Sequence, residues 1–176
     1  MNYATIKRRD IANGPGVRVS LFVSGCTHRC PGCFNEIAWD FSYGEPFTEE
    51  VEQLLLAELD SEYVKGLSLL GGEPFEPQNQ RALLPFLQKF KARFPQKTVW
   101  CYSGYTFEEL TGARESRCRC EVTDEMLSYL NVLVDGRFVE EKKNIRLRFR
   151  GSENQRLIDM EKTRAAGEIV LWDEKQ

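Results

Sequence analysis

Three of the six cysteines in this 176-residue chain lie in one short loop, residues 24–35. Cys26, Cys30 and Cys33 have the spacing C-x3-C-x2-C. Thiolate sulfur is a soft ligand that favours iron–sulfur clusters, zinc and copper(I). Cysteines this close can converge on one inorganic centre without long-range closure of the chain. The motif therefore predicts a fold that presents this loop around a metal or cluster.

The motif alone leaves several chemistries open. Three thiolates on a four-iron cluster would leave one iron open to a substrate, whereas structural zinc usually takes four protein ligands. A fourth zinc ligand could come from His28, inside the motif, or from another cysteine. A disulfide with one odd thiol would need an oxidising compartment, which nothing in the sequence supports. The further candidates for a zinc ligand are Cys101, Cys118 and Cys120.

Composition excludes some classes of function. Hydrophobic residues make up 41% and charged residues 29% of the chain, and its formal charge of −3 shows no basic excess suited to nucleic acid. The start of the chain lacks the apolar segment of a signal peptide, and no apolar run approaches the ~20 residues of a membrane span. We therefore expect a single cytoplasmic domain, residues 1–176, that binds neither nucleic acid nor membrane.

Apolar and β-branched runs alternate with segments of helical periodicity along the chain. A strand at residues 17–23 leads directly into the cysteine loop, and a charged segment at 114–121 reads as an exposed loop. The alternation predicts βαβ units and a parallel sheet, hence an α/β fold. Further strands are expected at 66–70, 97–102 and 131–134, a late strand at 168–172, and helices at 49–59, 83–90, after Thr106 and at 126–130.

Two unusual loops follow predicted strands. The cysteine loop follows the first, and the stretch Gly71, Gly72, Glu73, Pro74 follows the second. In parallel α/β folds functional groups gather at the carboxyl ends of the strands, so both loops should face one mouth. A double glycine lets backbone approach a ligand closely, and Glu73 could offer its carboxylate or simply fix the loop. Taken alone, this second motif is also typical of an ordinary turn.

The combination of both motifs resembles the radical S-adenosylmethionine superfamily. The resemblance implies an incomplete (β/α) barrel with parallel strands, open on one side. It also implies a [4Fe-4S] cluster held by Cys26, Cys30 and Cys33, and S-adenosylmethionine (SAM) bound at the open iron. The residues expected to contact SAM by this resemblance are Gly32, Cys33, Phe34, Gly71, Gly72 and Glu73.

Other stretches narrow the resemblance to the glycyl-radical-enzyme activases, and among them to those that act on anaerobic ribonucleoside-triphosphate reductase. The resemblance implies reductive SAM cleavage to a 5′-deoxyadenosyl radical, which would generate a glycyl radical on the large reductase subunit. It also implies a low-potential electron donor such as flavodoxin or ferredoxin. The matching stretches are residues 13–18, 25–35 with Trp39, 133–138 and 150–156.

Rival interpretations remain open from the sequence. One is an activase of another glycyl radical enzyme, or a radical SAM enzyme for a small molecule. A rival of another class is a zinc-binding interaction module without catalytic activity. Two features depart from the family pattern: Leu70 stands where relatives often carry a small hydroxyl residue, and the loop with Cys118 and Cys120 resembles an insertion.

Overall fold

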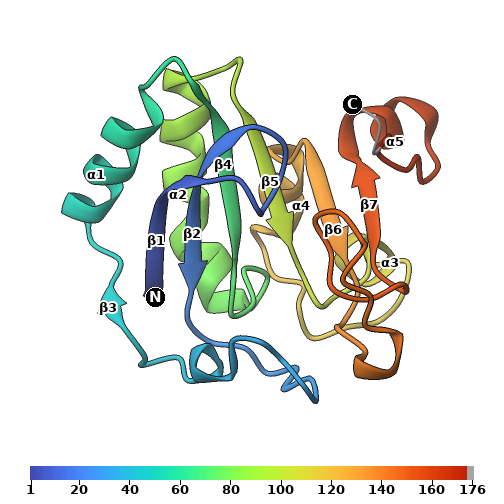
Figure 1. Ribbon diagram of the computed structural model, residues 1–176. Helices are drawn as coiled ribbons and strands as arrows, with labels where there is room; N and C mark the ends of the chain where they lie inside the picture. Colours follow the sequence, from blue (N-terminus) through green and yellow to red (C-terminus); the bar gives the residue numbers. More distant parts are fainter. Residues whose placement is uncertain (174–176) are drawn as a thin grey trace.

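The computed structural model describes residues 1–173, which form a mixed α/β fold on one seven-stranded sheet (Figure 1). Its four central strands run parallel, and all four are predicted by the sequence. They have few exposed side chains, as expected for parallel strands covered on both faces. In spatial order they are β2 (Val17–Val23), β4 (Val64–Gly71), β5 (Thr98–Tyr102) and β6 (Val132–Asp135).

Three further strands at the sheet edges are antiparallel to their neighbours. They are β1 (Asn2–Asp10) beside β2, β3 (Glu45–Pro46) beside β1, and β7 (Arg156–Asp159) beside β6. The sequence did not predict them. β1 carries exposed charged residues in its second half and shows no clear apolar alternation, whereas β3 and β7 are too short to show a pattern.

With these edge strands, the expected fold class is confirmed only in part. A mixed α/β fold is confirmed, whereas a barrel is not shown, because the strand order β3-β1-β2-β4-β5-β6-β7 is that of an open sheet. The turn between β1 and β2 spans only residues 11–16, too short for the crossover that a parallel pair requires. The pair is therefore an antiparallel hairpin, and the sheet is only partly parallel.

Helices cover one face of this sheet (Figure 1). Apolar residues of α1, α2 and α4 pack with those of the central strands in one core. Among the described residues, no helix is long and apolar enough to cross a bilayer. The α-helices are α1 (Glu49–Leu59), α2 (Pro77–Arg93), α3 (Phe107–Thr111), α4 (Thr123–Ser128) and α5 (Met160–Ala166), and the 3-10 helices are η1 (Glu36–Trp39) and η2 (Glu140–Lys142).

Strand alternation divides the side chains between the two faces. In β5, Val99 and Cys101 join the core under the helices, whereas Trp100 belongs to a separate cluster with Val134. Phe149 and Trp172 pack against that second cluster. The face opposite the helices is thus covered by loops rather than by helices.

Two expectations about later segments are corrected. Residues 168–172 form no strand but contribute one isolated bridge, between Leu171 and Ile158, with hydrogen bonds from Asp159 to Val170 and from Trp172 to Leu157 beside it. The segment 114–121 is exposed only in part. Cys118 is fully buried, and its carbonyl accepts a hydrogen bond of 2.6 Å from Nε2 of Gln80, which ties the segment to α2.

Candidate metal centre and cofactor cavity

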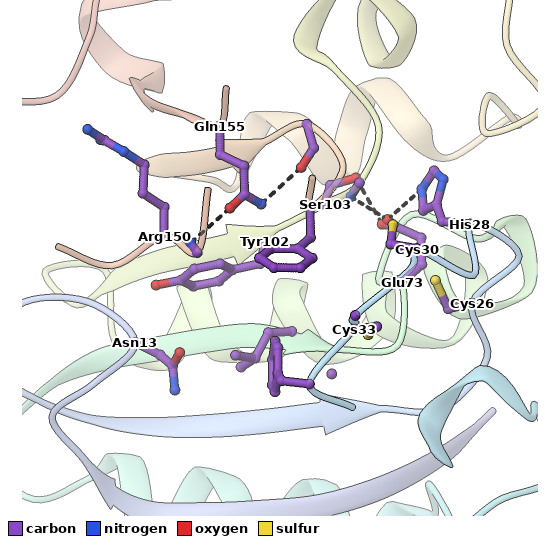
Figure 2. Close-up of a pocket in the computed structure, with 18 of the residues that line it drawn as sticks. Asn13, Cys26, His28, Cys30, Cys33, Glu73, Tyr102, Ser103, Arg150 and Gln155 are labelled. Atoms are coloured by element: carbon purple, nitrogen blue, oxygen red, sulfur yellow. Dashed lines mark hydrogen bonds and ion pairs between the residues drawn. The ribbon is translucent and has the colours of Figure 1, made fainter. Parts of the chain in front are cut away.

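The loops after the four parallel strands line one cavity of about 470 Å³ (Figure 2). Both motifs identified in the sequence reach it, as expected from their positions at strand ends. The residues from these loops are Cys26, Cys30, Gly32, Cys33 and Phe34 after β2, Gly71, Gly72 and Glu73 at the end of β4, Ser103 and Gly104 after β5, and Gly136 after β6.

The three cysteines of the motif lie together at one end of this cavity (Figure 2). All three are partly exposed free thiols. Burial, followed by the charge of Glu73, raises the pKa of Cys26 to about 12, and burial next to Cys33 raises the pKa of Cys30. Metal binding at these sulfurs would therefore release protons.

The cysteine loop owes its path to glycine and to backbone hydrogen bonds. Gly25 has φ +97°, and a Cβ there would lie 2.2 Å from the ring of Phe41, so only glycine fits. The N–H of Gly25 donates to the carbonyl of Ala38 at 2.8 Å, and the N–H of Cys26 donates to the carbonyl of Trp39 at 3.2 Å. The motif thus folds back onto η1.

Two carboxylates from the segment after β4 hold the residues between the first two cysteines. Glu76 accepts hydrogen bonds from the backbone N–H of Thr27 at 2.8 Å and from its hydroxyl at 2.5 Å. Oε2 of Glu73 lies 3.1 Å from Nε2 of His28. The N–H of Glu73 also donates to the carbonyl of Gly25 at 2.8 Å. The second loop therefore fixes the position of the first.

The carboxylate of Glu73 is fully committed to protein partners. Oε1 accepts from the N–H of Phe75 at 2.8 Å and from the hydroxyl of Ser103 at 2.9 Å. Oε2 accepts from the N–H of Gly104 at 2.7 Å and faces His28. A carboxylate offers about four acceptor positions, and this residue is 1% exposed. The side chain thus joins the loops after β2, β4 and β5.

Gly72 allows two stretches of backbone to approach each other. A Cβ at this position would lie 2.6 Å from the carbonyl oxygen of Gly25 and 2.9 Å from that of Ala38. Gly72 also donates its N–H to Val23 at 2.7 Å. The double glycine is therefore required for packing against the cysteine loop, whatever it contacts in the cavity.

Gly32 and Phe34 lie at the rim of the cavity. Phe34 is 82% exposed, and Gly32 has φ +70°. A Cβ on Gly32 would come within 2.8 Å of the carboxyl carbon of Glu140 in η2. The cysteine loop thus contacts the segment after β6. The sequence did not predict this contact with Glu140.

The rival zinc ligands are engaged elsewhere. Nε2 of His28 faces Glu73, and its ring packs at 4.2 Å on that of Tyr105. Cys101 and Cys118 are fully buried in the core. In residues 1–173, no group of three His, Cys, Asp or Glu side chains, the three motif cysteines included, is placed to hold one metal ion. Cys26, Cys30 and Cys33 nevertheless line one cavity, and soft thiols of this kind suit a cluster, in which each sulfur binds a different iron.

Sequence reasoning missed the far end of the cavity. Asn13, Tyr102, Arg150 and Gln155 line it there, away from the cysteines (Figure 2). The Tyr102 hydroxyl is buried without a hydrogen-bond partner among the described residues, and burial raises its pKa. Tyr102 could have been found as the last residue of a predicted strand. Asn13, Arg150 and Gln155 lie in the stretches 13–18 and 150–156 that carry the family resemblance, although no cavity role was assigned to them.

Asp135, at the end of β6, has a structural role in this fold. It is 1% exposed and accepts hydrogen bonds from Nε of Arg156 at 2.9 Å and from the N–H of Phe107 at 2.7 Å. Arg156 also binds both carboxylate oxygens of Glu108, at 3.0 and 2.8 Å. These hydrogen bonds tie β6, β7 and α3 together beside the cavity.

A cysteine loop of this kind, at the carboxyl end of a partly parallel sheet, is typical of an iron–sulfur protein. The family model described as a 4Fe-4S single cluster domain matches residues 12–158, which supports an iron–sulfur cofactor. Anaerobic ribonucleoside-triphosphate reductase-activating proteins from Vibrio cholerae and Escherichia coli K12 are each 41% identical over 157 residues, which cover 88% of this chain and 96% of each relative. That of Enterobacteria phage T4 is 40% identical, over 89% of this chain and 93% of its own. The chain belongs to this family of activating proteins.

Proposed function

We propose that the protein is a radical SAM activase that generates a glycyl radical on the large subunit of anaerobic ribonucleoside-triphosphate reductase. Relatives across most of the chain are named as activating proteins of that reductase. The observation that carries the proposal is the position of the C-x3-C-x2-C motif in the cavity formed by the strand-end loops. The activating role rests on family membership, and the radical chemistry rests on this site.

Cys26, Cys30 and Cys33 would hold the [4Fe-4S] cluster. When bound, the cluster supplies the electron that cleaves SAM to methionine and the 5′-deoxyadenosyl radical, which takes a hydrogen atom from glycine. The protein's own contribution is positional. Glu73 and Glu76 fix the cysteine loop from outside, so the three sulfurs are presented on a rigid support.

SAM would lie in the cavity between the cysteines and the loops after β4 and β5. Gly32, Cys33, Phe34, Gly71, Gly72 and Glu73 line this region and remain the proposed contacts. Because protein donors hold its carboxylate, Glu73 would also place these loops. A low-potential flavodoxin or ferredoxin would supply the electron.

The proposal is tested by anaerobic incubation of the reconstituted protein with SAM, dithionite and the reductase, followed by electron paramagnetic resonance. We expect a glycyl radical signal on the reductase that requires all three components and the wild-type cysteines. A signal with another glycyl radical enzyme but not with the reductase would favour an activase of different specificity. Colourless protein with stoichiometric zinc and no radical would contradict the proposal in favour of a binding module.

A further inference from the structure

One stretch of the chain carries an unusual concentration of positive charge. Residues 142–150, here called the basic loop, contain five cations and no carboxylate, in a chain whose formal charge is −3. The loop belongs to the long connection between β6 and β7. Its cations are Lys142, Lys143, Arg146, Arg148 and Arg150.

The basic loop is a built structure. Lys143 forms an antiparallel bridge with Ser152, and the N–H of Asn144 donates to the carbonyl of Gly151 at 3.2 Å. Oε1 of Gln155 accepts from the N–H groups of Gly151 and Ser152, at 2.9 and 3.1 Å. These contacts close the base of the loop and fix its direction.

An aromatic anchor holds the other side of the loop. The ring of Phe149 packs edge-on against Trp100, with centroids 5.3 Å apart, and against Trp172 at 6.1 Å. Phe149 has φ +57°, in the left-handed region that residues other than glycine seldom enter. The chain thus adopts an unfavourable backbone conformation where it packs this ring against the two tryptophans.

The exposed side of the loop presents an apolar residue among cations. Ile145 is 92% exposed, although it also borders the cavity. Lys142 and Arg146 are exposed as well, and neither makes an ion pair within residues 1–173. An apolar anchor surrounded by charge is the pattern of a protein interface with a polar rim. A phosphate backbone would make no use of the isoleucine.

We infer that the basic loop is the docking surface for an acidic patch on the protein substrate. The inference rests on the proposed function, which identifies that substrate as the reductase. The loop lies along the cavity, and Arg150 lies at the end away from the cysteines (Figure 2). Ile145 would be buried at the centre of the contact. Lys142 and Arg146 would attract and orient the acidic surface, so that a substrate glycine enters the cavity.

The test measures the affinity of the SAM-loaded protein for the reductase under anaerobic conditions. Arg146→Glu and Lys142→Glu should each raise the Kd about tenfold at low salt. The difference in Kd between each charge variant and wild type should become smaller as the salt concentration rises from about 0.05 M to 0.5 M, because salt screens the interactions between charges. Ile145→Ser should raise the Kd at both salt concentrations. Lys65→Glu is the matched control, because Lys65 is an exposed lysine at the other end of β4.

SAM cleavage with dithionite, without reductase, separates this inference from the proposed function. Arg146→Glu and Lys142→Glu should cleave SAM at the wild-type rate, because neither side chain lines the cavity. Wild-type affinity in both charge variants, or equal loss in Lys65→Glu, would overturn the docking role while leaving the activase proposal intact. Charge variants that lose only oligonucleotide binding would also overturn it. A wild-type protein that neither cleaves SAM nor binds the reductase would overturn both.

Discussion

Glu76 accepts two hydrogen bonds from Thr27, one from its backbone N–H at 2.8 Å and one from its hydroxyl at 2.5 Å. Thr27 lies between the first two cysteines of the motif, whereas Glu76 lies just before α2. Together with the contact between Glu73 and His28, this pair holds the cysteine loop against the segment that follows β4. The loop geometry therefore depends on two residues outside the cysteine motif.

The first prediction concerns this pair. Glu76→Ala should lower the free energy of unfolding by about 1–2 kcal/mol, because two hydrogen bonds to a charged group are lost where Thr27 is partly accessible to water. It should also reduce the iron bound per chain, since the loop is no longer held. Glu76→Gln keeps an acceptor oxygen and should restore most of both. Equal iron content in the Ala variant and wild type would show that the loop needs no such support.

The second prediction concerns Gly72. Gly72→Ala places a Cβ 2.6 Å from the carbonyl oxygen of Gly25, so the cysteine loop must shift. We expect lower iron content in a chain that still folds, as judged by circular dichroism. Gly167→Ala is the control, because its φ of +73° strains the backbone while nothing lies within 4 Å of the new Cβ. If both variants lose iron alike, general destabilisation is the cause and the steric argument fails.

The third prediction separates ligands from other cysteines. Cys26→Ala, Cys30→Ala and Cys33→Ala should each abolish the visible absorption of the cluster, because each removes one of its three thiolates. Cys120→Ala is the matched control, since Cys120 is also partly exposed but does not line the cavity. Iron and absorption should stay near the wild-type values in that variant. An equal loss in Cys120→Ala would disprove the ligand assignment.

The fourth prediction is a pH dependence of stability. The hydrogen bonds from Arg156 lower the pKa of Glu108 from 4.5 to about 2. A carboxyl with a lowered folded-state pKa stabilises the protein above its unfolded pKa and loses this contribution as the pH falls toward the folded value. Wild-type stability should therefore drop between about pH 4.5 and pH 2 by more than that of Glu108→Gln. Parallel curves in denaturant titrations would contradict this assignment.

Strong local patterns predicted the central sheet and the position of the site. The apolar runs of β2, β4, β5 and β6 and the turn signals after them were sufficient to bring both motifs to one cavity. β1 was missed because its second half is charged and lacks apolar alternation. Its pairing follows instead from the short turn that joins it to β2. The incomplete barrel was expected from the family resemblance, whereas the described strands form one open sheet with antiparallel edges.

The supporting residues of the site could not be predicted for a related reason. Glu76, Ser103 and Gln155 act through contacts between segments far apart in the sequence, and each is an unremarkable polar residue in its local context. The role of Glu73 likewise depends on which donors surround its carboxylate in the folded chain. Cysteine spacing, by contrast, is local and could be interpreted directly.

The most direct test of the proposed activity follows one hydrogen atom. Reductase labelled with glycine deuterated at its α-carbon is incubated anaerobically with the reconstituted protein, SAM and dithionite, and the 5′-deoxyadenosine is analysed by mass spectrometry. The proposal predicts that one deuterium appears in 5′-deoxyadenosine for each glycyl radical formed. Unlabelled 5′-deoxyadenosine beside a glycyl radical, or a radical formed without any 5′-deoxyadenosine, would contradict it.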